Sequence, residues 1–165
     1  MEQVKTLDPS KIYYIDESGI DHHLYRTHGW SLRGEKIFAD IPGSRRERTC
    51  IFSASQKSKL VAPLVFQGSC NSLLVDEWLK TTLLPAVPRG SILVFDNASF
   101  HKSPTSRKLI ADAGCHLLFL PTYSPDLNPI EHIWFVVKNL LRKALPDSSN
   151  PLLSICHCVS QCCFS

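Results

Sequence analysis

The sequence predicts an α/β fold in which a mixed central sheet is flanked by helices. In the second half of the chain, the stretch from Ile92 to Trp134 reads as strand, loop, helix, strand, loop, helix, an alternation that is typical of parallel strands. The first half contains apolar, strand-like runs separated by turn residues, which favours antiparallel pairing. With 44% hydrophobic and 20% charged residues, the composition is that of an ordinary globular domain.

Length and charge set the outer limits of the interpretation. The 165 residues suit one domain that is large enough to bury a core. The net charge of +3 is mild, so a nucleic-acid partner has to be argued from where the positive residues fall. No apolar run approaches the roughly 18 residues that span a bilayer, and the amino terminus lacks the basic start and apolar core of an export signal. We therefore expect a cytoplasmic protein without a membrane partner.

After a polar lead at residues 1–10, the first half of the chain is expected to form the antiparallel part of the sheet. Gly19 and Gly34 are expected to mark its turns. A further segment, from Leu60 to Phe66, has strand character, but Pro63 within it suggests an edge strand or a bulge. The three expected antiparallel strands lie at residues 12–16, 23–32 and 48–55.

A helix of about fourteen residues should follow, capped by Asn71 and ended by Pro85 and Pro88. Its apolar residues recur at helical spacing, which predicts that one face packs on the sheet. These residues are Leu74, Trp78, Leu79 and Leu83.

The second half then supplies the parallel strands and their helices. The run from Ile92 to Phe95 has the length and content of a buried strand and ends on Asp96. A helix near residues 103–113, a stop at Gly114 and a short strand at 116–120 come next. The last helix of this half begins near Pro129, with Asn128 as the expected N-cap and Glu131 at the third position.

Three acidic residues stand where the chemistry of the domain would be expected. Asp16 interrupts an apolar strand, Asp96 ends another, and 34 residues, 97 to 130, separate Asp96 from Glu131. For Glu131 alone, a capping box at the helix start explains the residue as well as a metal site does. Two strands that each carry an aspartate need a common counter-charge, however, because an unpaired carboxylate is costly to bury. A divalent cation would supply it.

The segments YIDESG, LVFDNASFHKS and LPTYSPDLNPIEHIW resemble the three catalytic motifs of DDE transposases of the mariner superfamily, specifically its bacterial insertion-sequence branch. The resemblance implies a ribonuclease-H-like catalytic domain at residues 11–146. Its triad would be Asp16, Asp96 and Glu131, holding two Mg²⁺ ions, with Mn²⁺ as a substitute. It also implies DNA strand cleavage and strand transfer in double-stranded DNA. In this cut-and-paste reaction a homodimer cuts the element at its ends and inserts it at a TA-type target.

Other residues near these motifs are candidates for supporting roles. Asn97 and His101 follow Asp96 closely and are expected to hydrogen-bond a metal ligand or the substrate rather than to act as a general base. Positive residues in the first half and after Asp96 suit a phosphate-binding rim, although a solvated hairpin explains the run in the first half equally well. These candidate DNA-binding residues are Arg33, Lys36, Arg45, Arg46, Arg48 and Lys102.

The two ends of the chain depart from the family pattern. The residues before Asp16 are too few for a helix-turn-helix domain, so we expect a DNA-recognition segment encoded separately or upstream, or else a truncated copy. Residues 147–165 read as a linker and a tail with four of the seven cysteines. A zinc site would need two well-spaced ligand pairs, so we expect a frayed or half-buried terminal helix with free thiols instead.

Two alternatives to an active transposase remain open on the sequence. One is another ribonuclease-H-like nuclease, which would share the fold and the metals but not the SPDLNPIE loop. The other is an inactive or domesticated remnant that binds DNA or a partner without cutting it.

Overall fold

The computed structural model describes residues 8–20, 31–36, 38, 49–121, 124–145, 148 and 150–164. Within them a five-stranded sheet has the order β3-β2-β1-β4-β5. The pairs β1–β2 and β2–β3 are antiparallel, and the pairs β1–β4 and β4–β5 are parallel, which confirms the predicted mixed sheet. The strands are β1 (Ile12–Ile20), β2 (Thr49–Gln56), β3 (Lys59–Gln67), β4 (Ile92–Phe95) and β5 (His116–Phe119).

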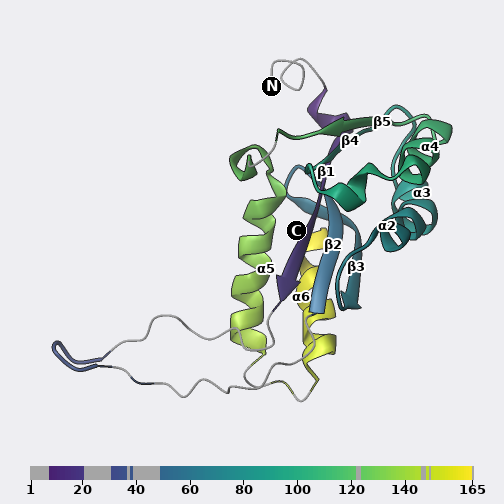
Figure 1. Ribbon diagram of the computed structural model, residues 1–165. Helices are drawn as coiled ribbons and strands as arrows, with labels where there is room; N and C mark the ends of the chain where they lie inside the picture. The colour runs from purple at the N-terminus through teal and green to yellow at the C-terminus, as the bar shows by residue number, and fades with distance from the viewer. Residues whose placement is uncertain are drawn as a thin grey trace.

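Helices cover both faces of the sheet (Figure 1). The first face carries a continuous helical segment made of α2 (Ser72–Trp78), a π-helical stretch (Leu79–Leu83) and α3 (Leu84–Ala86), and beside it α4 (Pro104–Asp112). The second face carries α5 (Ile130–Ala144) and α6 (Pro151–Phe164). Short 3₁₀ turns lie at Pro9–Lys11, at Ser99–Lys102 (η3) and at Pro125–Leu127. No helix within the described part of the chain is long and apolar enough to cross a membrane.

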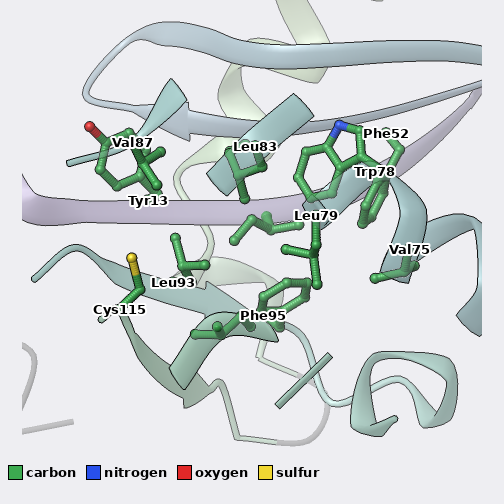
Figure 2. Packing of buried hydrophobic residues seen from close by; sticks show 13 residues of the cluster. Tyr13, Phe52, Val75, Trp78, Leu79, Leu83, Val87, Leu93, Phe95 and Cys115 are labelled. Carbon is green, nitrogen blue, oxygen red and sulfur yellow. The ribbon is translucent and has the colours of Figure 1, made fainter. Parts of the chain in front are cut away.

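Each face of the sheet has its own core because side chains alternate along a strand. From β1, Tyr13 and Ile15 pack into the first core, under α2 and α4, whereas Ile20 packs into the second, under α5 and α6. Figure 2 shows the first core, where Phe52 and Trp78 meet edge to face with ring centroids 4.5 Å apart. Asp16 follows Ile15 and so projects from the opposite face, toward α5.

Several expected elements form where the sequence places them. The Asn71 side chain caps α2 by accepting a hydrogen bond from the Leu74 amide at 2.9 Å. Ser103 caps α4 in the same way, and Gly114 ends it with a positive φ of 71°. The expectation for Pro63 is also confirmed, because β3 is an edge strand and its register with β2 shifts between Phe52 and Ala54.

The first half differs from the prediction in two ways. β1 does not stop at Asp16 but continues to Ile20, so the turn expected at Gly19 is wrong. The reason is the antiparallel ladder with β2, which runs from Tyr14 to Ile20 and outweighs the poor strand propensity of the polar residues within it. Most of the strand expected at 23–32 lies outside the described residues, and residues 31–32 are not in a strand. Among the described residues, the antiparallel strands are β1, β2 and β3.

The cysteine-rich end forms α6, which packs against α5 and β3. Ile155, Cys158, Val159 and Cys162 are buried in the second core. All seven cysteines are free thiols. This end of the chain thus completes the core on the α5 side of the sheet.

Candidate active site

Two of the three predicted acids come together because their strands are parallel neighbours. The ladder between β1 and β4 ends with the pair Ile15–Phe95, and Asp16 and Asp96 are the next residue on each strand. The pairing of two buried apolar strands therefore sets two carboxyl groups side by side, at the point where β4 ends and β1 continues. The charge of Asp96 acts on Asp16 and raises its pKa.

Glu131 joins these two acids from the first turn of α5. Its side chain is exposed. The charge of Glu131 raises the pKa of Asp16, and this effect is larger than the effect of the Asp96 charge on the same group. No described group donates a hydrogen bond to the Glu131 carboxylate, so the capping box is not formed. A carboxylate in the first turn of a helix is also stabilised by the positive end of the helix dipole. The structure therefore gathers the predicted triad from β1, β4 and α5.

Asn128 links Asp16 to the start of α5. Its side-chain amide donates a hydrogen bond to Asp16 Oδ2 at 3.1 Å, and its backbone carbonyl accepts one from the Glu131 amide, also at 3.1 Å. The prediction that Asn128 is the N-cap is wrong, because α5 begins at Ile130 and Pro129 occupies the cap position without a side-chain bond. Only 6% of Asn128 is exposed, and its Oδ1 atom has no partner within the described chain. Sequence analysis missed this role because a local cap was sufficient to explain an asparagine before a helix.

Burial dominates the electrostatics of Asp16. It raises the pKa of the carboxyl group to about 7, and the charges of Glu131 and Asp96 act in the same direction. The Glu17 amide, which donates to Asp16 Oδ1 at 2.8 Å, offsets part of this rise. The Trp134 indole N–H makes no hydrogen bond of normal length to a described residue, yet it is close enough to Asp16 to lower the pKa slightly. We therefore regard Trp134 as a neighbour of Asp16 and not as an established donor.

Asp96 is in a different environment, and its ionised form is favoured. Burial alone would raise its pKa, but the hydrogen bond and charge of His101, the Ala98 amide and the charge of Lys102 together lower it. The His101 Nδ1 atom lies 2.5 Å from Asp96 Oδ1. The imidazole is almost fully buried and packs edge to face on Phe95, at 4.9 Å between ring centroids. His101 thus lies buried between Asp96 and Phe95.

The remaining predicted residues fall into three groups. Asn97 is half-buried next to Asp96, and Lys102 is exposed but close enough for its charge to act on Asp96. Arg33 and Lys36 are exposed in a turn that Figure 1 shows well away from the sheet, and the structure does not bring them to the acids. Arg45, Arg46 and Arg48 lie outside the described residues.

The donor set suits a hard divalent cation, because it consists of carboxylate oxygens from three elements. Burial raises the pKa of Asp16 most, the charges of Glu131 and Asp96 raise it further, and a bound cation would oppose these effects. In the described part of the chain, however, no three acidic, histidine or cysteine side chains are already close enough together to hold an ion. Binding would therefore require side-chain movement, for example of the exposed Glu131.

Comparison with known families decides the assignment. The profile of the DDE superfamily endonucleases matches residues 11–152, which is most of the chain. The chain belongs to this family. The match covers the positions of all three acids and confirms the DDE relationship that their motifs suggested, whereas the bacterial insertion-sequence branch stays a prediction. It identifies the chain as a nuclease domain of the DDE type.

Two curated relatives of this DDE domain are similar over part of their length. The Tc1 transposase of Caenorhabditis elegans is 42% identical over 59 residues, which are 33% of this chain and 22% of the Tc1 protein. The uncharacterised protein y4pE/y4sA of Sinorhizobium fredii is 33% identical over 67 residues, which are 40% of this chain and 47% of that protein. The matches thus span less than half of either relative.

Solved structures confirm the ribonuclease-H-like fold of the DDE domain. The Mos1 mariner paired-end complex with Mn superimposes with a TM-score of 0.68 at 18% identity, covering 97% of this chain and 58% of that chain. The Mos1 strand transfer complex gives a TM-score of 0.65 at 18% identity, with 97% and 57% covered. The catalytic core domain of BIV integrase gives 0.56 at 13% identity, with 92% and 82% covered. At these identities the likeness concerns the fold.

Proposed function

We propose that this chain is the catalytic domain of a cut-and-paste DNA transposase, in which Asp16, Asp96 and Glu131 hold the metal ions that drive strand cleavage and strand transfer. The observation that carries the proposal is the shared environment of the three acids. A buried aspartate whose pKa is raised to about 7 by burial and by two further carboxylates costs folding energy unless a cation is bound. The family match and the similarity to Tc1 transposase support the reaction class.

Mg²⁺ is the ion that we propose, with Mn²⁺ as a substitute. The Mos1 structures were solved in one case with Mn and in another, the catalytic domain, with Mg, which supports the use of divalent ions. When bound, a pair of such ions activates the attacking oxygen and stabilises the leaving oxygen of an in-line displacement at phosphorus. Water as the attacking group gives a nick, and a DNA 3′ hydroxyl gives strand transfer.

The residues around the acids orient these carboxylates by hydrogen bonds, before metal ions and DNA bind. Asn128 and the Glu17 amide each hold one oxygen of Asp16, which leaves the remaining lone pairs for a cation. His101 and the Ala98 amide both bond Asp96 Oδ1, and we propose that Asp96 Oδ2 binds the cation. The Asn128 carbonyl also accepts a hydrogen bond from the Glu131 amide. Asn128 therefore links β1, through Asp16, to the start of α5.

The partners follow from the same assignment. We propose double-stranded DNA as the substrate, with element ends and a TA-type target, and a homodimer as the working form. The similarity to Mos1 complexes named as paired-end and strand transfer complexes supports these partners. A helix-turn-helix segment, encoded separately or upstream, would recognise the element ends. Lys102 is the proposed phosphate contact nearest the acids, and Arg33, Lys36, Arg45, Arg46 and Arg48 are proposed contacts farther along the DNA.

Strand transfer separates a transposase from other nucleases of this fold. A labelled duplex with a free 3′ hydroxyl should become joined to a supercoiled plasmid when the chain and Mg²⁺ are present, and the Glu131→Gln variant should join none. A plain nuclease would nick the plasmid without attaching the label. That result, or joining by the Glu131→Gln variant, would overturn the proposal.

A further inference from the structure

The helix that carries Glu131 has two unlike flanks beside its buried stripe. On one flank, His132 and Val136 line a cavity of about 400 Å³ together with the β2–β3 turn and Cys162 of α6. The other flank lies on the Glu131 side, because residues three or four apart share a side of a helix. Its members after Glu131 are Phe135, Lys138 and Arg142. The buried stripe between the flanks is Ile130, Ile133, Trp134, Val137 and Leu141.

Phe135 is unusual for its position on this flank. Its side chain is 66% exposed, although it stands only one turn, about 6 Å along the axis, beyond Glu131. Helical side chains tilt toward the amino terminus, so the ring covers the surface next to the turn that carries Glu131. An exposed aromatic ring at the border of the acidic cluster offers a flat apolar face to whatever enters the site.

The two residues that follow on the same flank are positively charged. Neither Lys138 nor Arg142 forms an ion pair with any described acid. Arg142 is positioned by a hydrogen bond from its Nη1 atom to Asn139 Oδ1 at 2.8 Å. Both side chains are partly exposed. The flank thus presents, in order from the active site, a carboxylate, an aromatic ring and two positive charges that pair with no acid in the described residues.

We propose that this flank of α5 binds the unpaired DNA strand that leads to the scissile phosphate, with a base stacked on Phe135 and phosphates on Lys138 and Arg142. The inference rests on the proposed function, which brings a DNA strand to Glu131. A base face is accessible to a side chain only where the duplex is opened, and a phenylalanine ring without hydrogen-bonding groups stacks on any base. The alternation of ring and cations matches the alternation of base and phosphate along a single strand.

Fluorescence of 2-aminopurine tests the stacking directly. A single-stranded oligonucleotide with one adenine replaced by 2-aminopurine is titrated with the full chain in the presence of EDTA, so that no cleavage occurs. We expect quenching on binding, and we expect Phe135→Ala to lose the quenching and to weaken binding by about 5- to 150-fold, the value of one stacked base. Phe135→Tyr should retain the quenching and the affinity. Lys138→Ala should reduce the slope of log affinity against log salt concentration by about the amount that one phosphate contact contributes.

Val136→Ala is the matched control, because Val136 is also exposed on α5, at 49%, but lies on the cavity flank. It should bind and quench as the wild type does. Equal quenching by Phe135→Ala and the wild type, equal losses in Phe135→Ala and Val136→Ala, or no binding by the wild-type chain would each overturn the inference. If plasmid joining nevertheless persists, the proposed function stands and only the assignment of this flank fails.

Discussion

At the scale of single residues, the ionised carboxylate of Asp16 is electrostatically unfavourable in the metal-free protein. Its folded-state pKa of about 7 lies above the ordinary value of 3.8, so the folded state binds the extra proton. The resulting stabilisation is fully present below pH 3.8 and is lost as the pH rises to about 7. This pKa difference lowers the free energy of unfolding of the metal-free protein at pH 8 by up to about 4 kcal/mol relative to its value at low pH.

Asp16→Asn should therefore stabilise the metal-free protein at pH 8, because the asparagine removes the buried charge and keeps an oxygen to accept the Glu17 hydrogen bond. We expect a Tm increase of roughly 5–10 °C without metal and no further increase with Mg²⁺, whereas the wild type should gain stability from Mg²⁺. Asp112→Asn, an exposed aspartate of α4, is the control. A Tm for Asp16→Asn at or below that of the control would contradict the account of Asp16.

Asn128 provides a second prediction at this scale. Asn128→Ala removes the donor to Asp16 Oδ2, so the Mg²⁺ concentration at half-maximal cleavage should rise by about 10- to 100-fold. Asn71→Ala is a suitable control because it removes the cap of α2, at a cost of about 1 kcal/mol, and the Asn71 side chain caps α2 without bonding any of the three acids. If both variants raised the Mg²⁺ concentration at half-maximal cleavage equally, Asn128 would contribute only to the stability of the fold, which would contradict this prediction.

The sequence could predict the acids but not all of their neighbours. Asp16 and Asp96 were recognisable because each interrupts or follows an apolar run, and Glu131 because of its place at a helix start and the specific motif around it. The bond between Asn128 and Asp16 joins residues 112 positions apart, and only the folded chain brings them together. His101 was expected to support a ligand, and the structure gives it a partner in Asp96 and a buried place on Phe95.

At the scale of elements, α6 shows how much the carboxyl-terminal helix contributes to the fold. Ile155 is fully buried in the core shared with α5 and β3. Ile155→Ala should lower the free energy of unfolding by roughly 2–5 kcal/mol in a urea titration followed by circular dichroism. Leu153→Ala, at an exposed position of the same helix, should change it by no more than about 0.5 kcal/mol. Equal effects would mean that α6 does not pack as described.

Elements with a strong local signal were predictable, and elements fixed by pairing were not. The caps at Asn71 and Ser103 and the proline in β3 act locally, and each does what its residue type predicts. The extension of β1 to Ile20 depends instead on the ladder with β2, whose residues are about 30 to 40 positions away. For the same reason the sequence left open whether the terminal helix is frayed or half-buried, and the packing of α6 on α5 and β3 decides for the half-buried helix.

At the scale of the whole molecule, the fold brings one acid from each of three elements near enough for the charges of Asp96 and Glu131 to act on Asp16. The parallel pair β1–β4 supplies two of the acids, and α5, lying across the second face, supplies the third. Two apolar cores, one on each side of the sheet, fix these elements relative to one another. The central claim is that this point is a metal-dependent centre for cutting DNA.

Cleavage of supercoiled plasmid by the purified chain, with Mg²⁺, with Mn²⁺ and with EDTA, tests that claim most directly. We predict nicking that requires a divalent ion and that falls by roughly 10³-fold or more in Asp96→Asn, because loss of one ligand forfeits several kcal/mol of charge stabilisation. Asp112→Asn, which keeps the acidic cluster intact, should cut at the wild-type rate. Nicking that persists in EDTA or in Asp96→Asn, or no nicking with either metal, would contradict the account.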